Sequence, residues 1–125
     1  MSSENITYLT DAVLITAVVP VGQADAMLKA ARNVGANGGI VHHARGTGAR
    51  ERLGLLGITV EAEKEVVSIV VAADHQELIA EAIYHAGGLH VPGGGYLYIT
   101  PLEKVATYIP KEALDRLESR HKESG

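Results

Sequence analysis

The stretch EVVSIVVAADHQELIAEAIYHAGG, residues 65–88, contains the clearest periods in the sequence. Its first part, Glu65 to Ala73, is β-branched and almost wholly apolar, which is typical of a strand buried on both faces. The second part has apolar residues at helical spacing, which predict the buried face of a helix: Leu78, Ile79, Ala82, Ile83 and Ala86. Gly87 and Gly88 are expected to end this helix.

The same order of elements occurs upstream. Residues Asp11 to Val19, DAVLITAVV, read as a buried strand that Pro20 and Gly22 interrupt. A helix is expected next, with an apolar stripe formed by Ala24, Met27, Leu28, Ala31 and Val34. A second strand is predicted from about Gly39 to Arg45, GIVHHAR.

The chain after the second helix predicts one more long strand, Tyr96 to Thr100, and a short apolar stretch around Val105 that could extend the sheet edge. Residues 1–10 are expected to form an arm, and Pro110 is well placed to open a C-terminal helix over 111–120. The order β-α-β, loop, β-α-β predicts a single α+β domain, 1–125. Its architecture is the ferredoxin-like βαββαβ, with a four-stranded antiparallel sheet.

Composition limits the function classes. The chain is 46 % hydrophobic but has no Phe, Trp or Cys, so its core must be aliphatic. Its strands are apolar on both faces while only two long helices can cover them, which predicts a homo-oligomer. A net charge of −4 argues against nucleic acid as a partner. The absence of cysteine, of a basic leader and of a membrane-spanning run predicts a soluble, cytoplasmic protein without membrane insertion.

Two glycine-rich segments are the candidate ligand loops. Gly46-Thr47-Gly48 follows the second strand and opens a long segment, 46–64, of a length that is usually functional in a compact domain. Gly93-Gly94-Gly95 precedes the fourth strand, within the glycine-rich segment 87–95. Bare backbone at such points can approach a ligand and offer N–H donors. A flexible turn explains the first motif equally well, whereas three successive glycines in the second need a reason, and close approach to a ligand is one. Neither completes a dinucleotide fingerprint or a P-loop.

Charged residues crowd the first glycine motif. Arg50, with Arg45 and Arg52 as further candidates, could bind an anion, whereas the plainer interpretation is a solvated loop with Glu51 as a partner. Lys64 or Glu65 could anchor the loop or reach a ligand. The histidines lack the spacing of a metal site and no nucleophile–base pair is visible, so no catalytic residue and no metal ligand is assigned.

Three motifs in this order, GTGARERLG (46–54), EKEVVSIVV (63–71) and GGLHVPGGGYLYITPLEK (87–104), resemble the PII signalling superfamily. The resemblance covers about residues 11–109. Within the superfamily the chain is similar to the PII-like branch, including the carboxysome-associated proteins linked to bicarbonate. The resemblance implies a homotrimer with an adenine nucleotide in each intersubunit cleft, between the T-loop (46–64) and the B-loop (87–95).

The resemblance also assigns residues. Gly46, Thr47 and Gly48 at the T-loop base and Gly93, Gly94 and Gly95 in the B-loop would hold the nucleotide. Tyr96 stands where the family has a phosphate-binding lysine, and Arg50 stands where it has a glutamine for magnesium and 2-oxoglutarate. Thr107 and Ile109 replace two phosphate-binding arginines. Fewer cations favour AMP or ADP over ATP.

The sequence therefore predicts a non-enzymatic regulator, without a prosthetic group. It would sense ADP or AMP, with bicarbonate as a candidate second ligand. Its T-loop would signal to an unidentified target, such as a membrane transporter or an enzyme of carbon or nitrogen metabolism. The T-loop has no tyrosine to accept the uridylylation known in the family. Two other function classes stay open: a small trimeric ferredoxin-like enzyme using the same cleft, and a ligand-free structural interaction module.

Overall fold

The structure is a computed structural model of the chain that describes residues 6–45, 63–108, 111–112 and 115–116. A four-stranded sheet forms its centre, in the order β3-β4-β2-β5, with every neighbouring pair antiparallel. The strands are β2 (Ala12–Pro20), β3 (Ile40–Arg45), β4 (Glu63–Ala72) and β5 (Tyr96–Leu102). This is the predicted ferredoxin-like sheet, with the first and third predicted strands at its centre.

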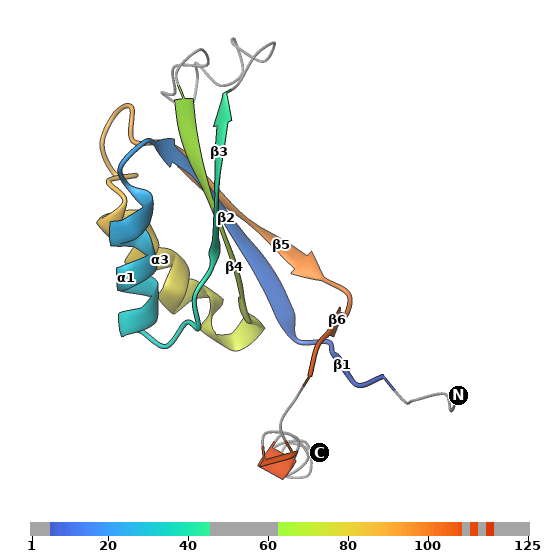
Figure 1. Cartoon of the computed structure of the whole chain (residues 1–125). Helices are drawn as coiled ribbons and strands as arrows, with labels where there is room; N and C mark the ends of the chain where they lie inside the picture. Colours follow the sequence, from blue (N-terminus) through green and yellow to red (C-terminus); the bar gives the residue numbers. More distant parts are fainter. Residues whose placement is uncertain (1–5, 46–62, 109–110, 113–114, 117–125) are drawn as a thin grey trace.

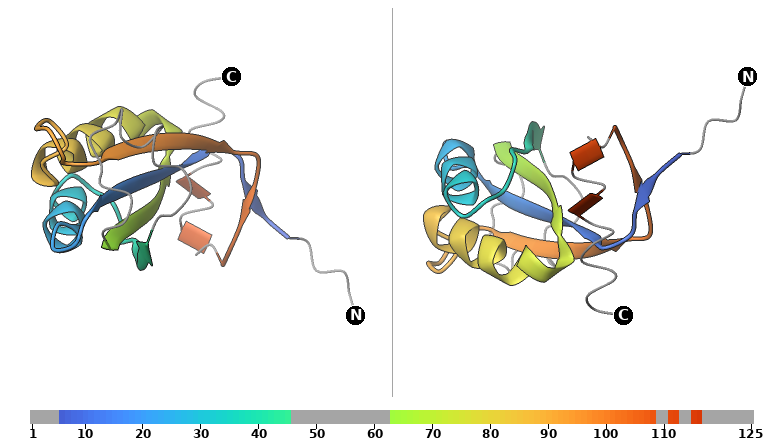
Figure 2. Two further views of the ribbon diagram at one scale, coloured as in Figure 1. Left: turned by 90° about the horizontal axis from the view of Figure 1, so that it is seen from above. Right: turned by 90° about the horizontal axis from the view of Figure 1, so that it is seen from below.

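Two helices cover one face of the sheet, as Figures 1 and 2 show from three directions. Helix α1 spans Ala24–Asn33 and helix α3 spans Gln76–Ala86, preceded by the short 3-10 helix η1 (Ala73–His75). Gly87 follows the last helical residue of α3, as predicted. No helix in the described part of the chain is both long and apolar enough to cross a membrane.

The core lies between the helices and the sheet and is entirely aliphatic. Alternate residues of the two central strands face the helices, because successive side chains on a strand point to opposite faces. The buried residues from the strands and helices are Val13, Ile15, Ala17, Val19, Val67, Ile69, Val71, Ala24, Met27, Ala31, Ile79 and Ile83. Ala36 and Leu89 complete this core from the connections.

The opposite face of the sheet is largely apolar and partly exposed, although Thr16 on it is buried. Leu14, Thr16 and Val18 of β2 lie beside Val70, Ser68 and Val66 of β4. Val70 of β4 is 51 % exposed, and Tyr98 of β5, which pairs with Thr16 of β2, is 50 % exposed. Neither described helix covers this face, which agrees with the expectation that the strands are apolar on both sides.

Several element boundaries differ from the prediction. Strand β2 includes Pro20, which was expected to interrupt it, and β5 continues to Leu102. Strand β4 begins at Glu63, so the last two residues of the segment 46–64 belong to the sheet. Val105–Ala106 forms β6, which pairs with β1 (Tyr8–Leu9) in a separate two-stranded sheet and does not extend the main one. Of the predicted helix 111–120, residues 111–112 and 115–116 are helical and the others lie outside the described residues.

The buried face of α3 is narrower than predicted, because Leu78 is 53 % exposed while its neighbour Ile79 is 2 % exposed. We expect Ile79→Ala to lower the free energy of unfolding by about 2–5 kcal/mol, the cost of a large-to-small change in a packed core. Leu78→Ala is the matched control on the same helix and should cost less than about 0.5 kcal/mol. Urea unfolding measures both, and equal losses would contradict this orientation of α3.

Candidate functional site

The predicted site residues that the structure describes gather at one end of the sheet. Antiparallel pairing brings the ends of β2 and β3 beside the starts of β4 and β5. Arg45 pairs with Glu63, Pro20 with Lys64, and Val18 with Tyr96. The two glycine segments were expected to line one cleft from this end. The predicted residues Gly46, Thr47, Gly48, Arg50 and Arg52 lie outside the described residues.

The pleat divides these residues between the two faces of the sheet. Glu65 has the same parity as the core residues Val67 and Ile69, so it faces the helices. Lys64 and Tyr96 have the opposite parity and lie on the exposed apolar face. Lys64 is nevertheless 7 % exposed. Glu65 and Lys64 therefore cannot contact the same part of a ligand from within one chain.

Tyr96 and Arg45 have different surroundings. The Tyr96 ring stacks on that of Tyr98, with 6.3 Å between the ring centroids. Burial, with a smaller contribution from Tyr98, raises the pKa of Tyr96 above its ordinary value, so it stays a neutral phenol. Arg45 is exposed and lies 3.6 Å from the Glu63 carboxylate. An exposed pair of this kind is weak and leaves Arg45 accessible to an anion.

Backbone contacts explain why the B-loop has glycine at positions 94 and 95. A Cβ on Gly94 would overlap the carbonyl oxygen of Gly88, so the loop closes on itself only with glycine there. Gly95 has φ +104° and its added Cβ would overlap the backbone of Val18, at the end of the sheet. The glycine run is thus required for the loop to reach the sheet, whether or not a ligand approaches it.

A pocket of about 210 Å³ lies between this loop and the turn that joins β2 to α1. Its lining residues are Pro20, Gln23, Gly87, Gly88, Val91, Pro92, Gly93 and Gly94. Among these residues Gln23 has the one hydrogen-bonding side chain, and none is charged. Such a surface can hold an apolar or planar neutral group, with backbone groups and one amide to orient it.

Part of this pocket was predictable and part was not. Gly93 and Gly94 were predicted site residues, and Gly87, Gly88, Val91 and Pro92 fall within the predicted B-loop. Pro20 and Gln23 were not predicted to be site residues. Pro20 was interpreted as a break after the first strand, and Gln23 lies just before the predicted helix. Their place at the pocket depends on a contact with β4, which no local pattern reveals.

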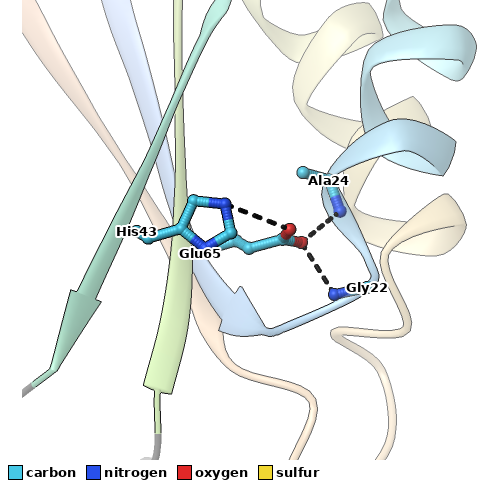
Figure 3. A network of polar contacts seen from close by, with 4 residues as sticks. All are labelled: Gly22, Ala24, His43 and Glu65. Carbon is cyan, nitrogen blue, oxygen red and sulfur yellow. Dashed lines mark hydrogen bonds and ion pairs between the residues drawn. The ribbon is translucent and has the colours of Figure 1, made fainter.

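That contact is made by Glu65 (Figure 3). Its Oε1 accepts hydrogen bonds from the backbone N–H groups of Gly22 and Ala24, both at 2.9 Å. Its Oε2 lies 4.0 Å from Nε2 of His43 on the neighbouring strand. Glu65 therefore supplies the acceptor at the start of α1, where the N-cap residue Gln23 makes no side-chain capping bond.

The hydrogen bond from Ala24 is the largest influence on Glu65 and lowers its pKa below the ordinary 4.5, together with the bond from Gly22 and the charge of His43. Burial acts in the opposite direction and is outweighed. The carboxylate form is thus favoured in the folded protein. In the described part of the chain, no group of three or more His, Cys, Asp or Glu side chains could hold a metal ion.

One comparison with known proteins supports the fold described above. A crystal structure of Arabidopsis thaliana PII bound to citrate matches with a TM-score of 0.59, over 76 % of this chain and 78 % of that one. The chain has the PII fold. Sequence identity in the match is 19 %, so the likeness is one of fold. No family model matches the sequence, and no curated protein matches it.

Within the PII fold, the lowered pKa of Glu65 makes stability depend on pH. Because the folded-state pKa lies below the unfolded one, the charged bonds stabilise the fold above the ordinary carboxyl pKa and are lost as pH falls through the folded value. We expect Glu65→Gln, which keeps an oxygen acceptor, to cost about 1 kcal/mol near neutral pH. The difference should shrink below about pH 5.

Thermal unfolding of both proteins across this pH range measures the effect. Glu63→Gln, at an exposed carboxylate on the same strand, is the control and should differ little from the unsubstituted protein at any of these pH values. A constant difference for Glu65→Gln down to low pH would show that the charge of Glu65 contributes nothing to these bonds.

Proposed function

We propose that the protein is a non-enzymatic regulator of the PII type that senses an adenine nucleotide. The observation that supports this most directly is the pocket at the glycine loop. It lies at the sheet end where β3 and β4 flank residues 46–62, so a ligand there would be next to the expected signalling loop. The predicted T-loop and B-loop residues, with Lys64 and Tyr96, are its proposed contacts.

The size of the pocket favours a site shared between subunits. Pockets that enclose a whole drug-sized ligand measure roughly 300–1,000 Å³. A pocket of about 210 Å³ on one chain accommodates part of a nucleotide and leaves the remainder to other surfaces. Lys64 and Tyr96, on the opposite sheet face, would then contribute from a neighbouring copy. This supports the proposed homotrimer with a ligand in each intersubunit cleft.

The chemistry of the pocket favours a nucleotide with few phosphates. Its lining residues include no charged side chain, and Tyr96 is neutral. With so few cations, each additional phosphate gains little Coulomb energy and still loses its hydration. We therefore propose ADP or AMP over ATP. Citrate in the Arabidopsis protein is a small carboxylate, which makes bicarbonate a reasonable second ligand to test here.

Signalling would then pass through residues 46–62 to a target protein. We propose a cytoplasmic regulator acting on a transporter or on an enzyme of carbon or nitrogen metabolism, and carboxysome-linked bicarbonate metabolism is one such setting. A ligand can shift the equilibrium between two conformations of this loop only by the difference between its binding free energies for them. Exposed Arg45, at the last position of β3, is the proposed anion contact nearest to this segment, with Arg52 as its partner in the loop.

Calorimetry of the purified protein against AMP, ADP, ATP, cyclic AMP and bicarbonate tests the function. We expect ADP or AMP to bind more tightly than ATP, and the nucleotide to be recovered unchanged. Turnover of the nucleotide would support the enzyme alternative. No binding to any of these ligands would contradict the sensor and favour a structural interaction module.

Light scattering tests the assembly. We expect a trimer at micromolar concentration, because the exposed apolar sheet face needs a cover. Val70→Asp should reduce the mass, since a carboxylate on that face would be buried against a second copy without a partner. Leu78→Asp, at an equally exposed position on α3, is the control and should leave the trimer intact. A monomer for the unsubstituted chain would contradict both the trimer and the shared site.

A further inference from the structure

From strand β4, Glu65 holds the turn before α1 through hydrogen bonds. Gly22 in this turn has φ +103°, a backbone conformation that favours glycine. Gln23 makes no side-chain capping bond. The two amides on either side of Gln23 instead donate to one oxygen of Glu65, which is 43 and 41 residues away in sequence.

Glu65 itself does not line the pocket, but it is bonded to the turn that does. Gln23 and Pro20 line the pocket from the turn, and Gly93 and Gly94 line it from the loop. The loop wall is fixed by its own backbone contacts, since a Cβ at Gly94 would overlap Gly88. Pro20 is placed by its pairing with Lys64 in the sheet, whereas the two amides on either side of Gln23 are bonded to Glu65.

We propose that Glu65 is a positioning residue of the ligand pocket, which acts on the ligand through Gln23 and not by touching it. This rests on the proposed function. The Glu65 oxygen that holds the turn is already shared by two N–H donors at 2.9 Å. The side chain of Gln23, the one polar side chain of the lining, orients the ligand only while its two neighbouring amides are held.

A double-mutant cycle with ADP as the probe tests this role. Glu65→Ala and Gln23→Ala should each weaken ADP binding, on the order of tenfold, and the double variant should bind no more weakly than the weaker single variant. Glu65→Gln retains an acceptor oxygen and should recover most of the affinity lost in Glu65→Ala. If Glu65 contacts the nucleotide directly, the two losses multiply, which would overturn the proposal.

The matched control is Glu63→Ala, two residues earlier on the same face of β4. Its carboxylate reaches Arg45 at 3.6 Å and not the turn. Whether Glu63→Ala raises or lowers ADP affinity, its effect should therefore be independent of that of Gln23→Ala. The fold-changes of the two single variants should multiply in the double variant. Coupling as strong as that of Glu65 would show that any charge change on β4 alters the pocket, and would overturn the specific role of Glu65.

Amide exchange in the ligand-free protein separates this proposal from the proposed function. The Gly22 and Ala24 amides should exchange faster in Glu65→Ala and at the normal rate in Glu63→Ala, with circular dichroism confirming that both variants are folded. Unchanged exchange in Glu65→Ala overturns the positioning role even if ADP binds. Faster exchange without ADP binding to the unsubstituted protein supports the positioning role while contradicting the nucleotide sensor.

Discussion

The pairing of β2 with β4 is the constraint on which the rest of the structure depends. The two central strands stay in register over nine pairs, from Ala12↔Ala72 to Pro20↔Lys64. A slip of β2 by one residue would turn Ile15 and the other inward-facing residues of that strand away from the helices. The same register places Glu65 beside the β2–α1 turn and Lys64 on the other face, so packing and the arrangement of the site are decided together.

The fold was predictable from sequence because each long strand and helix has a recognisable pattern within its own segment. The continuous apolar runs at 11–19 and 65–73 and the helical stripe that follows each of them define the elements, and their order restricts the topology to few choices. The structure confirms the sheet and both helices. The prediction was wrong for Leu78, because a stripe identifies which residues are apolar but not how wide the contact with the sheet is. The β1–β6 pair was missed because two-residue strands carry no period.

The site was predictable only where it is built from one segment. Gly93 and Gly94 were recognised as unusual, and the structure supplies a reason that sequence could not, the close approach to Gly88. Gln23 was not recognised, since its place at the pocket is fixed by a hydrogen-bond acceptor on β4. Glu65 was singled out, from its position after a loop, as a residue that could anchor the loop or reach a ligand. Its bonds to Gly22 and Ala24 are tertiary and have no sequence pattern.

The backbone contacts that require glycine in the B-loop are compatible with a ligand-binding role for the same loop. A loop that can close only with glycine presents backbone groups without side chains over them, and Gly93 and Gly94 line the pocket for this reason. The opposite wall is held by a carboxylate whose pKa is lowered by the bonds it accepts. For the proposed ligand, walls that are held in this way would lower the entropic cost of binding. The small volume of the pocket and the apolar face next to Lys64 and Tyr96 are both compatible with the proposed second copy of the chain, which would cover the face and complete the site together.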